Sequence, residues 1–318
     1  MTKKYQQVSF SSHGTQCDAW YFAGAPDGPF DGAAGRPVVV MAHGFGGTKD
    51  AGLEPFAERL GAAGLAVFAF DYRGFGTSDG HPRQRVSMAG QAEDYRAALN
   101  AAAAQPGVDP NRLVVWGISL SGGHALTVAA ERRDVCAVVA VVPLVNGLAA
   151  GRTAFGQVGA AAIAKSTVSS VRSAVAGRFG GRRVMIPLVG RPGAQAALTA
   201  DGYYESYTAL AGPSWRNEVD AAIGLELGSY RADRRAAHIT APVLMQIADF
   251  DRAAPAHAAA KAAFAARAEV RHYPCDHFDV FAGSDWFDTV LDHQLHFLIR
   301  HLTDAARDSQ ASGRKVKA

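Results

Sequence analysis

Short hydrophobic runs alternate along the chain with stretches in which apolar residues recur at helical spacing. The segments that predict buried strands lie at 37–42, 65–70, 112–116, 136–142, 242–247 and 268–273. Helical spacing predicts helices at 53–63, 86–104, 120–131, 253–266 and 285–301. Runs without polar positions are typical of strands covered on both faces. The alternation therefore predicts an α/β fold with a doubly wound, mostly parallel sheet.

Two further segments, at the start of the chain, alternate polar and apolar residues. They lie at 5–10 and 16–22 and are joined by Ser-His-Gly. This pattern predicts a hairpin that opens the domain.

The alternation of strands and helices stops after the strand at 136–142. The following segment contains small-residue and aromatic stretches broken by glycine and proline, and we interpret it as an inserted helical cap. The predicted organisation is a core of residues 1–143 and 238–306, a cap of residues 144–237, and a flexible tail of residues 307–318.

Composition and charge exclude several classes of protein. The length of 318 residues favours one α/β domain with a large insertion. Hydrophobic residues make up 48% of the chain, and its net charge of +3 is too small to indicate binding to nucleic acid or to a membrane. Residues 1–10 lack an apolar leader region, and no run reaches the roughly 18 residues of a membrane span. We therefore expect a cytoplasmic protein.

Neither a metal site nor a disulfide framework is predicted. Cys17, Cys136 and Cys275 are odd in number and widely spaced, so free thiols are expected. The histidine spacing does not complete a set of metal ligands. The predicted chemistry requires no metal and no organic cofactor.

The segment from Gly117 to Gly122 indicates a nucleophile elbow, in which a strand reverses sharply into a helix. Gly117, Ser121 and Gly122 are small enough for the strained turn, and the turn exposes the hydroxyl of Ser119 at the start of the helix. The pattern is G-x-S-x-S, with Ser121 where glycine is commoner. Ser119 is the candidate nucleophile.

A serine nucleophile needs a base and an acid from other strand ends. His277 follows the last strand in a short loop and is the candidate base. Asp251 follows the preceding strand and is the candidate acid, with Asp249 as the alternative. The other histidines, including His124 on the elbow helix, are expected to be packed or at the surface.

The charge that develops on a substrate carbonyl oxygen needs two backbone N–H donors. The N–H of Leu120 at the helix start is one candidate. The other is the N–H of Phe45, in a loop where neighbouring glycines allow close approach of the backbone.

These motifs together resemble the α/β-hydrolase superfamily over nearly the whole chain. His43-Gly44-Phe45 resembles its oxyanion loop, residues 71–78 resemble its D-x-R-G-x-G-x-S stretch, and Ser119, Asp251 and His277 fall at its triad positions. The chain is similar to the bacterial branch of dienelactone hydrolases and X-prolyl dipeptidyl-peptidase-like esterases. Two residues depart from the pattern, since Ser119 stands where dienelactone hydrolases have cysteine and Asp276 stands where glycine usually precedes the histidine.

The resemblance implies a serine hydrolase that cleaves a carboxylic ester or thioester of a small-molecule acyl substrate. Amide or peptide cleavage and carbon–carbon bond hydrolysis are alternatives at the same site. A non-catalytic binding protein of the same fold is a further alternative, although such proteins usually lose a triad member. The oligomeric state is open, with a homodimer as one alternative.

The cap supplies the candidate pocket residues. Aromatic side chains that could line the acyl pocket, or pack the cap onto the core, are Tyr203, Tyr204, Tyr207 and Trp215. Between residues 135 and 200 there is no acidic residue, but there are seven basic ones: Arg152, Lys165, Arg172, Arg178, Arg182, Arg183 and Arg191. This asymmetry predicts a solvated cationic face, with a preference for an acidic substrate as the alternative.

Overall fold

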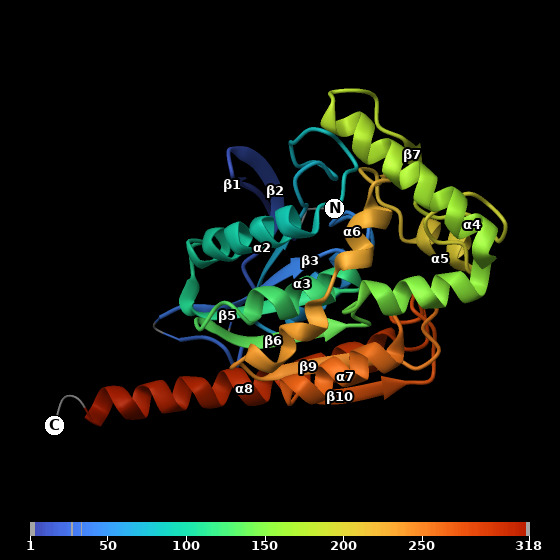
Figure 1. The fold of residues 1–318 in the computed structure, drawn as a ribbon. Helices are drawn as coiled ribbons and strands as arrows, with labels where there is room; N and C mark the ends of the chain where they lie inside the picture. The colour runs from blue at the N-terminus through green and yellow to red at the C-terminus, as the bar shows by residue number, and fades with distance from the viewer. Residues whose placement is uncertain (1–3, 27, 33, 316–318) are drawn as a thin grey trace.

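The computed structural model describes residues 4–26, 28–32 and 34–315, with side chains up to residue 303. Within that part of the chain, eight strands form one sheet in the order β1-β2-β4-β3-β5-β6-β9-β10 (Figure 1). Their bounds are β1 (Gln6–Ser12), β2 (Thr15–Phe22), β3 (Arg36–Ala42), β4 (Ala66–Phe70), β5 (Val108–Ile118), β6 (Val135–Val141), β9 (Val243–Ala248) and β10 (Glu269–Tyr273). The first two strands are antiparallel to their neighbours, and the others are parallel.

Helices cover both faces of this sheet, as the sequence pattern predicts. They are α1 (Glu54–Ala62), α2 (Met88–Ala103), α3 (Leu120–Ala129), α7 (Ala256–Ala266) and α8 (Phe287–Lys315). Helix α1 contacts α8, and helix α2 contacts α3. The doubly wound α/β prediction is therefore confirmed.

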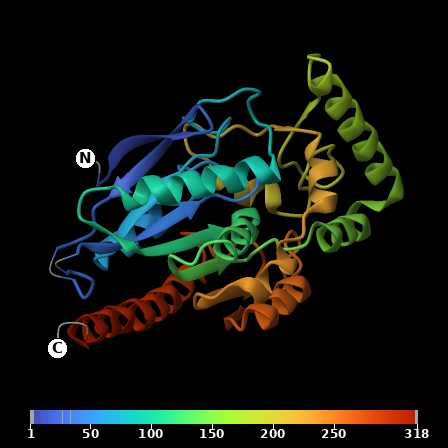
Figure 2. The ribbon, with the colours of Figure 1, turned by 60° about the vertical axis from the view of Figure 1, so that its left-hand side comes forward.

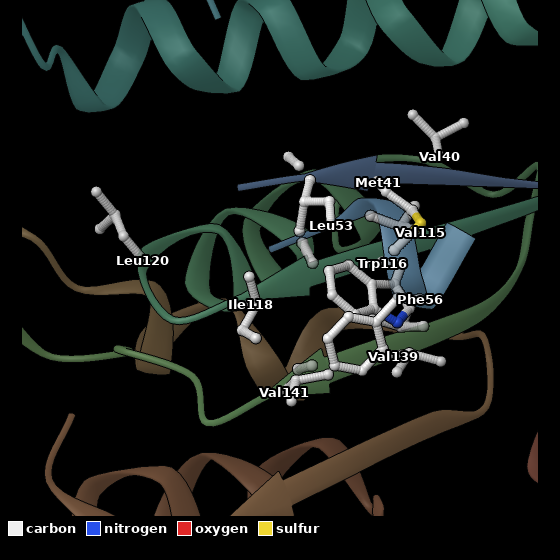
Figure 3. Packing of buried hydrophobic residues seen from close by; sticks show 14 of the residues in the cluster. Val40, Met41, Leu53, Phe56, Val115, Trp116, Ile118, Leu120, Val139 and Val141 are labelled. Atoms are coloured by element: carbon white, nitrogen blue, oxygen red, sulfur yellow. The ribbon is translucent and has the colours of Figure 1, made fainter. Parts of the chain in front are cut away.

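The central strands of the sheet lie in the hydrophobic core. Packing of β5 in this core fixes the position of the turn that follows it at Ser119. Trp116 in β5 packs against Phe56 of α1, with ring centroids 5.2 Å apart, and both side chains are fully buried (Figure 3). Burying an apolar side chain of this size stabilises a fold by about 1.5–3 kcal/mol. The indole N–H of Trp116 donates to Gln294 of α8, so its polar atom is also satisfied.

The segment between β6 and β9, to which we refer as the cap, lies to one side of the sheet in Figures 1 and 2. Its elements are α4 (Gly147–Arg178), β7 (Met185–Ile186), α5 (Tyr203–Ala209), β8 (Val219–Asp220), α6 (Ile223–Ser229) and the short 3-10 turns η1 (Ala232–Arg234) and η2 (Ala236–His238). Helix α4 bends at Gly159, which has a φ of 78°. The segment is mainly helical, with a two-stranded ribbon of β7 and β8 that the sequence pattern does not predict.

Several element boundaries differ from the sequence-based prediction, among them those of β5, α7 and α8. Strand β5 begins at Val108, before the predicted start at residue 112, because Val108 pairs with Arg36 of β3. Helix α7 begins after Pro255 rather than at residue 253. Helix α8 continues to Lys315, so the part of the predicted flexible tail from 307 to 315 is helical, and residues 316–318 lie outside the described residues. No proline follows residue 301, and the next glycine is at position 313.

None of the helices in the described part of the chain has the length and hydropathy that a membrane crossing requires.

Candidate active site

Ser119 lies at the turn between β5 and α3 in a strained conformation. Its φ is 57° and its ψ is −121°, a backbone conformation that residues other than glycine rarely adopt. A Cβ atom on Gly117 would lie 2.0 Å from the carbonyl oxygen of Ser121, and one on Gly122 would lie 2.7 Å from Pro143. The small residues around Ser119 are therefore required by the close approach of strand and helix.

Ser121, which replaces the commoner glycine, binds two neighbouring segments. Its hydroxyl donates to the carbonyl of His43 and lies 2.7 Å from the hydroxyl of Tyr72, which then acts as the donor. The side chain is buried. Ser121 thus joins the elbow to the loops after β3 and β4, and only the departure from the glycine pattern signalled this position in the sequence.

His277 is the partner of Ser119. Its Nε2 lies 3.0 Å from the Ser119 Oγ, and its Nδ1 lies 2.6 Å from Asp251 Oδ2. Because a carboxylate only accepts, Nδ1 carries the proton and Nε2 is free to accept one from the serine. Burial lowers the pKa of His277, but the charges of Asp251 and Asp276 outweigh it and raise this pKa above 6.5.

Asp251, rather than Asp249, contacts the histidine. The Oδ1 of Asp251 accepts the backbone N–H groups of Ala253 at 2.8 Å and Ala254 at 2.6 Å, which orients Oδ2 toward His277. Asp249 pairs instead with His272, with Nδ1 to Oδ1 2.7 Å, and both of these side chains are largely exposed. The structure therefore brings Ser119, His277 and Asp251 together and leaves Asp249 outside.

The two predicted N–H donors flank Ser119. Leu120 is the first residue of α3, and the loop of Phe45 approaches the serine so closely that a Cβ on Gly44 would lie 2.9 Å from the Ser119 Cβ. Among the hydrogen bonds of the described residues, neither N–H has an acceptor within the protein. Both are thus available to an oxygen atom bound at Ser119.

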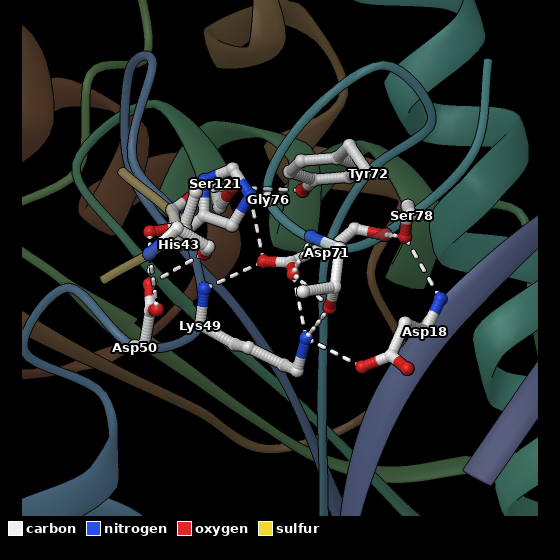
Figure 4. A network of polar contacts seen from close by, with 12 residues as sticks. Asp18, His43, Lys49, Asp50, Asp71, Tyr72, Gly76, Ser78 and Ser121 are labelled. Atoms are coloured by element: carbon white, nitrogen blue, oxygen red, sulfur yellow. Dashed lines mark hydrogen bonds and ion pairs between the residues drawn. The ribbon is translucent and has the colours of Figure 1, made fainter. Parts of the chain in front are cut away.

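A buried ion pair holds the loop that carries Phe45 (Figure 4). The Lys49 Nζ lies 2.6 Å from Asp71 Oδ2 and 2.6 Å from Asp18 Oδ1, although the Lys49 side chain is only 2% exposed. The Lys49 N–H also donates to Asp71 Oδ1 at 2.6 Å. A Cβ on Gly76 would lie 2.1 Å from Asp71 Oδ2, which explains that glycine of the 71–78 stretch. Lys49 could not be recognised from the sequence as part of this site, because its partners Asp18 and Asp71 are remote in the chain.

His124 is a packed residue, as predicted. It is fully buried on α3, with Nε2 3.0 Å from Gln91 Oε1 and Nδ1 3.0 Å from the Tyr230 hydroxyl. Burial lowers its pKa to about 3, so it stays neutral at ordinary pH. Among the described residues, no group of three or more His, Cys, Asp or Glu side chains is placed to share a metal ion.

A cavity of about 490 Å³ lies between core and cap and reaches Ser119 and His277. Its volume is within the range of small-molecule sites. Much of its wall is apolar and comes from both sides, including Val158, Ile163, Ile186, Leu198, Leu227 and Phe281.

Two of the four predicted aromatic residues line this cavity. Tyr203 and Tyr207 contribute to its wall. Tyr204 and Trp215 are not among the lining residues, because the Tyr204 ring lies under the Arg191 guanidinium and Trp215 packs behind Tyr207, with ring centroids 5.3 Å apart. Of the four aromatic residues, Tyr203 and Tyr207 thus line the cavity, whereas Tyr204 and Trp215 pack elsewhere on the cap.

The basic residues of the cap are divided between ion pairs and solvent. Arg183 pairs with Asp220 at 2.8 Å, and Arg191 pairs with Glu205 at 2.9 Å. Lys165 contributes to the wall of the cavity while its side chain remains exposed.

The fold and the contacts around Ser119 define the class of α/β-hydrolase-type hydrolases. The family model described as serine aminopeptidase, S33, matches residues 33–278. The chain belongs to this family.

Individual relatives agree with this class. The chain is 33% identical to the quorum-quenching protein AidA of Acinetobacter baumannii over 296 residues, which are 92% of this chain and 94% of AidA. It is 39% identical over 115 residues to the thiohydrolase aneE of Aspergillus aculeatus, and this match covers 36% of each chain. Among solved structures, the α/β hydrolase GrgF from Penicillium has a TM-score of 0.77 at 23% identity, covering 94% of this chain and 99% of GrgF. That likeness shows the fold alone.

Proposed function

We propose that the protein cleaves a carboxylic ester or thioester through an acyl-enzyme on Ser119. The Ser119 Oγ attacks the substrate carbonyl carbon while His277 Nε2 takes the hydroxyl proton. The N–H groups of Phe45 and Leu120 donate to the oxyanion of the tetrahedral intermediate. When the intermediate collapses, the bond to the leaving group breaks and His277 gives its proton to that group.

The second half of the reaction repeats these steps with water. His277 removes a proton from the water, whose oxygen attacks the acyl carbon, and the proton then returns to the Ser119 Oγ as the acid is released. Asp251 holds the imidazole in the required tautomer and stabilises the imidazolium.

The observation that carries this proposal is the continuous contact from Ser119 through His277 to Asp251. Each atom in that chain has the donor or acceptor character that nucleophilic catalysis needs, and Ser119 sits in the strained turn typical of such nucleophiles. A binding protein has no evident need for this arrangement.

The preference for esters or thioesters rests on two further observations. Relatives of the chain include two proteins named as thiohydrolases, aneE and apmlB. The apolar walls of the cavity suit an acyl chain, which would gain about 0.8 kcal/mol for each buried methylene group. Amide and carbon–carbon bonds are the alternative substrates at the same site.

The test is hydrolysis of p-nitrophenyl esters from acetate to dodecanoate, and of the corresponding thioesters and p-nitroanilides, by the wild type, Ser119→Ala, Asp251→Asn and Asp249→Asn. The proposal predicts turnover that Ser119→Ala abolishes and that Asp251→Asn lowers by about 10⁴-fold. Asp249→Asn is the matched control and is expected to retain wild-type turnover. Equal rates in the wild type and Ser119→Ala would contradict the proposal. Turnover of thioesters or amides alone, still dependent on Ser119, would change the substrate class.

A further inference from the structure

Asp276 immediately precedes His277, at a position where glycine is usual in the α/β-hydrolase superfamily that this chain resembles. Its Oδ1 accepts three hydrogen bonds: from the N–H of His277 at 2.8 Å, from the N–H of Arg252 at 3.0 Å, and from the hydroxyl of Tyr203 at 2.9 Å. His277 and Arg252 belong to the core, whereas Tyr203 begins helix α5 of the cap. One oxygen atom therefore joins three separate segments.

The second oxygen of Asp276 strengthens the same junction. Its Oδ2 lies 2.6 Å from the Arg252 Nε, and the Arg252 guanidinium donates to the carbonyl of Asp201 in the cap at 2.9 Å. The guanidinium also lies over the ring of Tyr203, 5.1 Å from its centroid. Arg252 and Asp276 thus make two independent polar connections from the core to the start of α5.

These contacts involve the residues next to Asp251 and His277 in the chain, so they bear on the alignment of that pair. Arg252 directly follows Asp251, and Asp276 directly precedes His277. The Asp276 carboxylate consequently holds the backbone next to the acid and the backbone next to the base at the same time. Displacement of this carboxylate would move the two loops relative to each other, and the 2.6 Å contact between Asp251 and His277 depends on their separation.

We propose that Asp276 is a positioning residue that makes the alignment of the Asp251–His277 pair depend on the seating of cap helix α5. This inference rests on the proposed function, because it assigns the residue a part in the reaction at Ser119. In this arrangement the cap does more than enclose the substrate. When α5 is seated, Tyr203 and Arg252 fix the Asp276 carboxylate, and the carboxylate fixes both loops.

The charge of Asp276 acts on His277 as well. The titratable and charged groups around His277 include the carboxylate of Asp251, the hydroxyl of Ser119, the ring of Tyr203, and the Asp276 carboxylate, which accepts the His277 backbone N–H and pairs with Arg252. Both carboxylates raise the pKa of His277, against the opposing effect of burial. Removing only the Asp276 charge is therefore expected to lower the pKa of His277, an effect that a purely structural contact would not produce.

Two variants separate the charge from the cap contact. Asp276→Asn keeps an oxygen that can accept the three hydrogen bonds but loses the charge that pairs with Arg252. Tyr203→Phe keeps the ring over Arg252 and loses only the hydroxyl that reaches Asp276. Asp249→Asn is the matched control, because it removes a carboxylate from the same edge of the sheet that pairs with His272 rather than with His277.

The experiment measures the His277 titration by NMR in each variant, together with the kcat and KM for an ester that the wild type hydrolyses. Asp276→Asn is expected to lower the pKa of His277 and to lower kcat by about tenfold, the usual scale for a lost charge-assisted contact. Tyr203→Phe is expected to leave the titration unchanged and to lower kcat several-fold with little change in KM. Asp249→Asn is expected to change neither quantity.

The outcomes distinguish this inference from the proposed function. An active wild type combined with an unchanged kcat in Asp276→Asn would overturn the inference alone, whether or not the titration shifts. A wild type whose turnover does not depend on Ser119 would overturn the proposed function, and the inference with it. Circular dichroism of each variant checks that it folds; if Asp276→Asn fails to fold, a wild-type kcat in Tyr203→Phe overturns the inference.

Discussion

The hydroxyl of Tyr207 donates a hydrogen bond of 2.6 Å to the carbonyl oxygen of Phe45. Tyr207 lies one turn after Tyr203 on α5, so the same cap helix contacts the loop after β3 as well as the histidine loop. The Phe45 carbonyl belongs to the residue whose N–H we assign to the oxyanion. The cap helix therefore contacts both the loop of the proposed oxyanion donor and the loop of the proposed base.

Tyr207→Phe should lower kcat while leaving the fold intact. Loss of the hydroxyl releases the Phe45 loop, and a misplaced oxyanion donor costs transition-state stabilisation rather than substrate binding. We expect a decrease in kcat of about tenfold with a nearly unchanged KM. Tyr204→Phe is the matched control, since Tyr204 is on the same helix but does not line the cavity. Steady-state kinetics that show equal losses in the two variants would contradict this prediction.

The pH dependence of kcat/KM should follow the titration of His277. Its pKa is raised, and only the neutral imidazole can accept the Ser119 proton. Activity should therefore rise with pH through a midpoint above 6.5, the ordinary value for histidine. A pH–rate profile measured with one ester tests this sign, and a midpoint below 6.5 would contradict it.

Lys49→Met should destabilise the protein strongly. The substitution leaves Asp71 and Asp18 without their shared cation, and Asp71 is fully buried. Breaking a buried pair in this way costs about 3–5 kcal/mol in the free energy of unfolding. Urea denaturation measures the loss, and Lys4→Met, which removes an exposed lysine paired with Glu58, should change stability by less than about 1 kcal/mol.

His124 should make the protein less stable in mild acid. Above about pH 6.5 it is neutral in both states, whereas between about pH 6.5 and about pH 3 only the unfolded chain binds the proton. Protonation of the unfolded chain at His124 should therefore lower the free energy of unfolding by about 1.4 kcal/mol for each unit by which the pH decreases in this range. His124→Gln should reduce that slope in urea denaturation between about pH 6.5 and about pH 4.5, and an unchanged slope would contradict the assignment.

The core strands along the chain and the residues at their carboxyl ends could be predicted from the sequence. Buried parallel strands leave a continuous apolar pattern, and Ser119, Asp251 and His277 each lie in the turn or loop that follows such a strand. Small residues around Ser119 also indicated the strained turn, because close backbone approach excludes larger ones.

Contacts between distant segments could not be predicted in this way. The burial of Lys49 depends on Asp18 and Asp71. The choice of Tyr203 and Tyr207 over Tyr204 as cavity residues depends on how a two-turn helix sits on the core. Asp276 departed from the family pattern, but the three segments that it joins become neighbours only in the folded chain.

The central claim is that Ser119 is the nucleophile, and labelling with a fluorophosphonate probe tests it most directly. The wild type should gain one probe per chain, located by mass spectrometry on the peptide that contains Ser119. Ser119→Ala should gain none, and His277→Ala should react far more slowly because its serine has no base. A probe bound to another residue, or equal labelling of the wild type and Ser119→Ala, would contradict the account.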